Sequence, residues 1–168
     1  MRNYTLALFY LVPINVSVAV PPKEKPEATT SETPLASPPK ETAAELLRLH
    51  NSVRTEAGKP ELRLNERLSS AAQRFAEFLS KARKYEHDAD GRTPAARIEA
   101  EGYDWGTWSE NIGWGTKEPA DVMRTWINSE GHRVNILGEE KEVGFGISKD
   151  VWVAVFATQL KEVDKKGE

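Results

Sequence analysis

The chain of 168 residues contains no cysteine, and this absence limits the chemistry open to it. Disulfide bonds, thiolate nucleophiles, thiolate zinc sites and lipid attachment at a cysteine are all excluded. Export from the cell is not excluded, because a core of this size can be stable without covalent cross-links.

The sequence also lacks a positive charge excess and a glycine-rich phosphate loop. Its formal net charge is −3, so bulk electrostatics do not favour a polyanionic partner. No loop of the kinds that hold nucleotide phosphates is present. We therefore expect no nucleic-acid partner and no organic cofactor. Hydrophobic residues make up 39% of the chain, which is sufficient for a folded core.

The first 20 residues have the pattern of a secretory signal peptide. A positively charged start and a short apolar run precede the small residues Ser17 and Ala19, which predicts cleavage near Ala19. Pro13 and Asn15 interrupt the apolar run, so a spanning helix of about 20 apolar residues fits less well. An uncleaved N-terminal anchor and a cytosolic strand are the alternatives.

The composition then changes twice along the chain. Residues 21–40 are rich in Pro, Glu, Lys, Ser and Thr, which predicts an extended linker that spaces the folded part from a membrane or cell wall. Residues 161–168 form a charged tail. The folded domain is therefore expected over residues 41–160.

Apolar residues at helical spacing predict four helices in this domain, each with a start signal. These signals are the capping-box pattern Thr42–Glu45, the cap Asn65, the Thr93-Pro94 pair, which opens a helix that ends at Gly102, and Pro119. A short helical piece, 132–137, is expected after a break at Ser129 and Gly131.

Three segments have the pattern of strands. Ser109–Ile112 is the first, and 143–147 and 151–157 form a hairpin through Lys149-Asp150. Glycines 144 and 146 lie on one face of their strand and leave room for close packing. The resulting order predicts an α+β domain with a small, mainly antiparallel sheet.

Histidine and glutamate supply the candidate functional residues. His132 lies in the mixed apolar and polar segment Trp126–Leu137, and His87 follows the end of a helix. His50 is interpreted as a structural histidine on the first helix. Glu110 lies in an apolar segment, where a carboxylate must be paired, exposed at an edge or functional.

These residues lie in motifs that resemble the CAP superfamily in its bacterial SCP-like form. This superfamily comprises the cysteine-rich secretory proteins, antigen 5 and pathogenesis-related 1. The motifs occur in the family's order and are Leu47-x-x-His-Asn-x-x-Arg54, His87-x-x-x-Gly-Arg-Thr-Pro-x-x-Arg97, Glu110-Asn111-Ile112, Gly131-His-Arg-x-Asn-Ile-Leu137 and Glu142-Val-Gly-Phe-Gly146. The resemblance implies a secreted α-β-α sandwich with a central antiparallel sheet flanked by helices.

The resemblance also implies a cleft in which two histidines and up to two glutamates converge. His87, Glu110 and His132 correspond to three of these positions, and in several relatives the histidines bind a divalent ion, often zinc. At the fourth position this chain has Ser129 instead of glutamate, and Glu130 comes one residue later. On a continuous helix that shift is about 100°, so Glu130 need not face the cleft.

Three roles for this trio remain open. The first is a weak divalent-metal site, for Zn²⁺ in particular, with Glu110 as the third ligand or as an orienting partner. The second is a metal-dependent extracellular hydrolase of peptides or cell-wall polymers, in which Glu110 is the candidate catalytic residue. The third is a buried polar network that only holds helices to the sheet. A serine hydrolase is disfavoured, because no Gly-x-Ser-x-Gly elbow is present.

Three tryptophans form a second candidate feature. Trp105, Trp108 and Trp114 alternate with glycines and could line a groove for an apolar or carbohydrate ligand, or pack in the core. We favour an extracellular binding module with a divalent-metal cleft over an enzyme. Its ligand is expected to be a lipid, a glycan or a protein.

Overall fold

The computed structural model describes residues 39–160. Predicted segments 1–20 and 161–168 lie outside this part, as does the linker 21–40 apart from its last two residues. None of the helices in the described part combines the length and apolar character that a membrane crossing requires.

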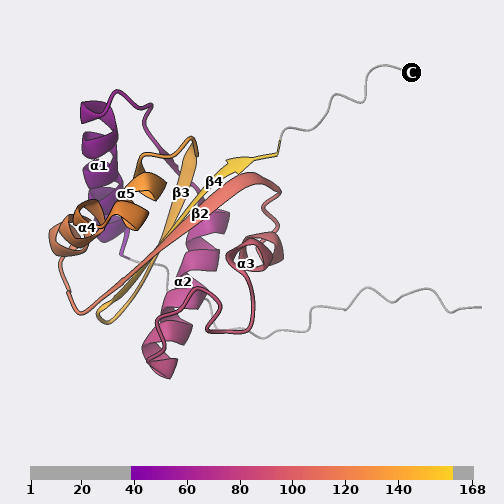
Figure 1. Ribbon diagram of the computed structural model, residues 1–168. Helices are drawn as coiled ribbons and strands as arrows, with labels where there is room; N and C mark the ends of the chain where they lie inside the picture. The colour runs from indigo at the N-terminus through magenta and orange to yellow at the C-terminus, as the bar shows by residue number, and fades with distance from the viewer. Residues whose placement is uncertain (1–38, 161–168) are drawn as a thin grey trace, which may run out of the picture. The chain divides into compact units, whose positions relative to one another are not determined.

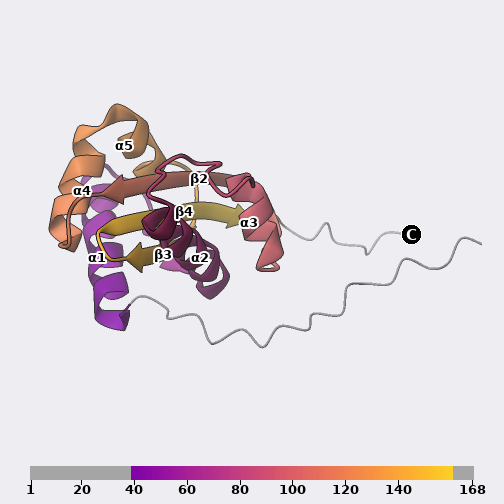
Figure 2. The same ribbon diagram turned by 90° about the horizontal axis from the view of Figure 1, so that it is seen from below.

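The described chain forms five helices and one four-stranded sheet. In chain order the elements are α1 (Lys40–Glu56), β1 (Arg63–Leu64), α2 (Glu66–Ala82), α3 (Pro94–Ala100), β2 (Trp105–Trp114), α4 (Pro119–Asn128), α5 (Glu130–Ile136), β3 (Glu142–Ser148) and β4 (Val151–Gln159). The strand order is β1-β3-β4-β2 (Figures 1 and 2). β4 pairs antiparallel with β3 and β2, whereas β1 pairs parallel with β3.

Alternation along β4 builds a core on each face of the sheet. Trp152, Ala154 and Phe156 face the helices α1, α4 and α5. Val151, Val153, Val155 and Ala157 face α2 and α3. Figure 1 shows these two helix groups on opposite sides of the sheet. The α-β-α sandwich expected from the sequence is therefore confirmed.

The close approach expected at the β3 glycines also occurs. A Cβ on Gly144 would lie 2.1 Å from the backbone of Leu68, and one on Gly146 would lie 2.1 Å from that of Ala72. Both clashes are with α2, so glycine at these positions allows α2 to lie directly on the strand. Buried alanines on α2, including Ala72 and Ala76, contribute to the same close contact.

Helix starts agree with the sequence prediction in three cases. The Asn65 side chain accepts from the backbone N–H groups of Arg67 and Leu68, Thr93 caps the helix that begins with Pro94, and Pro119 begins α4. The capping box at Thr42–Glu45 was wrong, because α1 begins at Lys40 and Thr42 lies inside it.

Two other element predictions also need correction. The short helix α5 begins at Glu130 and includes Gly131, so the break lies at Ser129 alone. The parallel strand β1 was missed, because two residues are too few to show an alternating pattern. The sheet is consequently mixed, although its longer pairings are antiparallel.

Candidate functional site

The loop between α2 and α3 carries His87 onto the edge strand β2. α2 ends at Ala82 and is followed by the C-cap Arg83, which has a left-handed backbone conformation with φ 54°. Two residues on, the Tyr85 ring stacks on Trp114 with 4.7 Å between ring centroids. His87 Nδ1 then lies 2.8 Å from Glu110 Oε1. The loop is thus held against β2 at two points.

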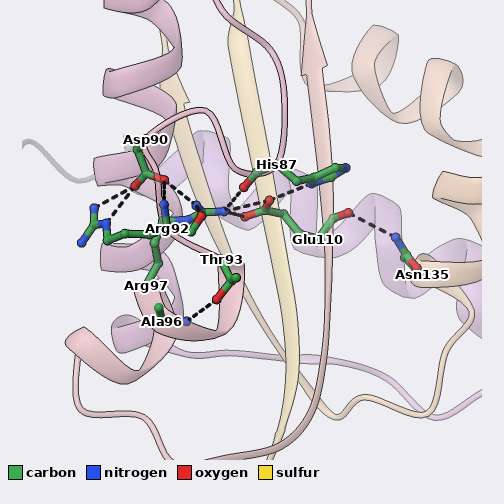
Figure 3. Close-up of polar contacts among 8 residues, drawn as sticks. All are labelled: His87, Asp90, Arg92, Thr93, Ala96, Arg97, Glu110 and Asn135. Carbon is green, nitrogen blue, oxygen red and sulfur yellow. Dashed lines mark hydrogen bonds and ion pairs between the residues drawn. The ribbon is translucent and has the colours of Figure 1, made fainter.

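Glu110 is a buried carboxylate whose two oxygens are already paired. Arg97 Nη2 donates to Glu110 Oε1 at 3.0 Å and to Oε2 at 2.9 Å, and the Arg97 side chain is only 3% exposed (Figure 3). Arg97 also donates to Asp90 and to the His87 carbonyl, and its guanidinium lies 3.5 Å from the Phe75 ring centroid. The carboxylate is therefore the centre of a neutralised ion-pair network.

This network determines which nitrogen of His87 is available. Its hydrogen bond with Glu110 raises the pKa of His87, and burial opposes that rise. Because Nδ1 is committed to Glu110, Nε2 is the ring nitrogen left for a ligand. The His87 side chain is 56% exposed, so a ligand can reach that nitrogen.

His132 approaches the same region from α5. Its Nδ1 is buried and has no hydrogen-bond partner within residues 39–160. Burial lowers the pKa of His132, and the charge of His87 lowers it further, so the two imidazoles lie within electrostatic reach of each other. Both effects favour the neutral imidazole, which is the form that binds metals.

Two asparagines fix α5 against β2. Asn111 Nδ2 donates to the His132 carbonyl at 3.0 Å. Asn135 Nδ2 donates to the Glu110 carbonyl at 3.2 Å and to Asn111 Oδ1 at 2.8 Å (Figure 3). These bonds hold the backbone of His132 in place beside Glu110.

A pocket of about 400 Å³ opens at this edge of the sheet. Its lining residues come from the α2–α3 loop, α3, β2 and α5, and they are His87, Pro94, Trp108, Ser109, Glu110 and Asn135. The Ser109 hydroxyl is buried and has no hydrogen-bond partner in the described part of the chain. The pocket thus contains an aromatic wall, mixed polar groups and one unsatisfied hydroxyl.

The donor atoms fit a two-imidazole metal site better than a His₂Glu site. Residues 39–160 contain no group of three or more His, Asp or Glu side chains placed to hold a metal ion. Glu110 is occupied by Arg97 and His87, whereas His132 Nδ1 is buried without a partner and His87 Nε2 lies on a half-exposed ring. Glu110 thus fits the role of orienting partner rather than of third ligand.

Ser129 stands at the fourth position of the family's cleft and Glu130 follows it, and neither residue adds a carboxylate to the pocket lining. Ser129 is the junction between α4 and α5, with an extended backbone. Glu130 is the exposed first residue of α5. The chain therefore turns at Ser129, where the sequence predicted a break, and Glu130 is not the continuation of α4.

The three tryptophans are not brought into one groove. Trp105 and Trp108 meet edge to face with ring centroids 6.4 Å apart, and Trp108 lines the pocket. Trp114 is 54% exposed and lies at the other end of β2, stacked on Tyr85. Trp108 is therefore the one tryptophan of the three in the pocket lining.

Arg97, Asn111 and Asn135 are site residues to which the sequence analysis assigned no role. Each occurs in one of the quoted motifs, which was the available signal. His50, interpreted as structural, is fully buried with its Nδ1 2.7 Å from the Leu46 carbonyl. It lies on α1, packs against Trp126, Phe145 and Phe156, and is not among the residues that line the pocket.

Comparisons with known proteins identify relatives of the chain. The model of the cysteine-rich secretory protein family, CAP, matches residues 47–156. The uncharacterised protein YkwD of Bacillus subtilis (strain 168) is 31% identical over 137 residues, which are 79% of this chain and 52% of YkwD. The chain thus spans about half the length of this curated relative.

Solved structures show the same fold at lower identity. An extracellular protein containing a SCP domain from Bacillus anthracis superposes with a TM-score of 0.69 at 21% identity, over 71% of this chain and 41% of that one. An outer surface protein from Borrelia burgdorferi gives 0.68 at 21% identity, over 72% of this chain and 95% of its own.

Proposed function

The chain belongs to the cysteine-rich secretory protein (CAP) family, and we propose on that basis that it is an extracellular binding module with a weak divalent-metal site in its pocket. The relatives support the location, because the Bacillus anthracis protein is described as extracellular and the Borrelia burgdorferi protein as an outer surface protein. The signal-peptide pattern of residues 1–20 agrees with it.

The observation that carries the metal site is the pairing of His87 with Glu110. The 2.8 Å contact leaves Nε2 pointing away from the carboxylate, as in metal sites where a carboxylate orients a histidine ligand. His132 Nδ1 supplies a second neutral nitrogen that has no other partner. Zinc accepts imidazole nitrogen readily and, when bound, would polarise an oxygen atom of a ligand.

Binding is favoured over hydrolysis by the state of Glu110. A catalytic base must be free to take a proton, but both oxygens of this carboxylate are held by the buried Arg97. Ser129 stands where relatives with the full tetrad have a second glutamate. The arrangement thus favours an ion that anchors a ligand.

Calorimetric titration of the metal-stripped full chain with zinc tests this function. We expect saturable binding that His132→Ala abolishes, together with a decrease of about tenfold or more in Glu110→Gln, because the orienting bond is lost. Glu130→Gln is the matched control and should bind zinc normally, since Glu130 is exposed outside the pocket. Unchanged affinity in the double variant His87→Ala/His132→Ala would contradict the proposal.

A further inference from the structure

Trp108 is held in one orientation by a chain of contacts that ends at the pocket. Glu99 on α3 accepts a hydrogen bond from Trp105 Nε1 at 3.0 Å. The Trp105 ring meets Trp108 edge to face, at 86° between ring planes. Trp108 in turn lines the pocket. A fixed indole of this kind loses little conformational freedom when a flat ligand stacks on it.

Two of the polar side chains that line the pocket with Trp108 are uncharged, and each keeps a group that can bond to a ligand. The buried Ser109 hydroxyl makes no hydrogen bond within residues 39–160. Asn135 uses its Nδ2 for two bonds to β2, which fixes the amide and leaves Oδ1 as an acceptor. A buried hydroxyl without a partner is destabilising, so a ligand that supplies one binds more strongly.

The charge in the pocket is balanced before any ligand arrives. Arg97 neutralises Glu110 through two hydrogen bonds to its oxygens. An ionic ligand therefore gains little from this pocket. An acyl chain or a sterol would provide no hydrogen bond to the Ser109 hydroxyl, to Asn135 Oδ1 or to His87 Nε2.

From these contacts we propose that the pocket binds one ring of a neutral saccharide, stacked on Trp108 and hydrogen-bonded to Ser109 Oγ and Asn135 Oδ1. A pyranose ring has apolar C–H faces for the indole and hydroxyls at its rim for the polar groups. The volume of about 400 Å³ lies in the range of small-ligand sites. The inference rests on the proposed binding function, since it names the ligand class of the same pocket.

The test titrates the full chain, in buffer with EDTA, with a panel of neutral oligosaccharides that includes chitotriose, maltotriose and cellotriose. Binding is followed by the NMR signals of the tryptophan indole N–H groups. We expect saturable millimolar binding that shifts the Trp108 signal. Trp108→Ala should weaken it about tenfold or more, and Trp108→Phe, which keeps a ring, should weaken it less.

Two further variants separate ligand contacts from effects on the fold. Phe78→Ala is the matched control, because this exposed aromatic side chain lies on α2 outside the pocket lining, and the saccharide affinity of the variant should be unchanged. Ser109→Ala should weaken saccharide binding severalfold without lowering the melting temperature, because the removed hydroxyl has no partner in the protein.

Three results would overturn the inference: no saturable binding to any saccharide of the panel, binding that Trp108→Ala leaves unchanged, or occupation of the pocket by a fatty acid or peptide instead. The EDTA keeps this result independent of the metal. If zinc binds and no saccharide binds, the saccharide inference alone is refuted. If a saccharide binds and zinc does not, the metal-site proposal alone is refuted.

Discussion

A single guanidinium, that of Arg97, connects three segments around the pocket. It pairs with Glu110 on β2, with Asp90 in the loop and with the carbonyl of His87, and it lies over Phe75 of α2. Because Arg97 is almost fully buried, these partners depend on it for their hydrogen bonds. Its loss would leave the buried Glu110 carboxylate with only the contact to the half-exposed His87 among the ion pairs of the described chain.

Arg97→Met should therefore lower the free energy of unfolding by about 3–5 kcal/mol, measured by urea denaturation. The pKa of His87 should rise further, because the positive charge of Arg97 lowers it at present, and NMR titration can follow that change. Arg92→Met is the control. Arg92 pairs with the same Asp90 from a half-exposed position, so its loss should change stability by less than about 1 kcal/mol. Equal losses in both variants would contradict this account.

At the level of residues, the sequence could name the histidines but not their partners. His87 and Glu110 were expected to converge, and they lie in hydrogen-bond contact. The pairing of Glu110 with Arg97 could not be predicted, because it depends on how the loop crosses β2. For the three tryptophans the sequence left open whether they line a groove or pack in the core. Trp105 and Trp114 occupy opposite ends of a long strand.

Among the strand glycines of the described chain, those on β3 have the closest helix neighbour, which is the backbone of α2. At Gly146 an added Cβ would lie 2.1 Å from the carbonyl oxygen of Ala72 and 2.2 Å from its carbon. These are backbone atoms, so the helix as a whole would have to move.

Gly146→Ala should consequently destabilise the protein by about 1–3 kcal/mol or more, seen as a lower melting temperature. Gly131→Ala offers the opposite case. No atom lies within 4 Å of its added Cβ, and it lies inside α5, where alanine is favoured over glycine by about 1 kcal/mol. It should raise the melting temperature slightly. A Gly146→Ala variant as stable as the parent would show that α2 can shift freely.

At the level of elements, periodicity and start signals predicted the long helices and the hairpin correctly. They failed where an element depends on tertiary contacts. The two-residue strand β1 exists through its pairing with Glu142 and Val143. The start of α1 at Lys40 likewise has no side-chain cap that the sequence could reveal.

For the whole molecule, His50 makes stability depend on pH. Its ring is fully buried among Trp126, Phe145 and Phe156, and burial lowers its pKa from 6.5 to about 4. Since the folded pKa lies below the unfolded one, the unfolded state takes up the proton first. The stability contribution is complete above pH 6.5 and is lost as the pH falls towards 4.

This difference in pKa corresponds to a loss of about 3 kcal/mol of unfolding free energy between pH 6.5 and 4. His132 acts in the same direction, because its pKa is also lowered, whereas the raised pKa of His87 acts in the opposite direction. Urea denaturation across this pH range, compared with His50→Leu, measures the effect. The variant should lose distinctly less stability on acidification, and parallel curves would contradict the assignment.

The edge of β2 has a consequence for how copies of this protein meet. The carbonyls of Glu110 and Ile112, on alternate residues of the outer strand, accept hydrogen bonds from the side chains of Asn135 and Trp126. The opposite edge is β1, which is two residues long. A second chain therefore finds no continuous row of free carbonyls along which to extend the sheet, and crowding of many copies does not lead to fibrous self-association by this route.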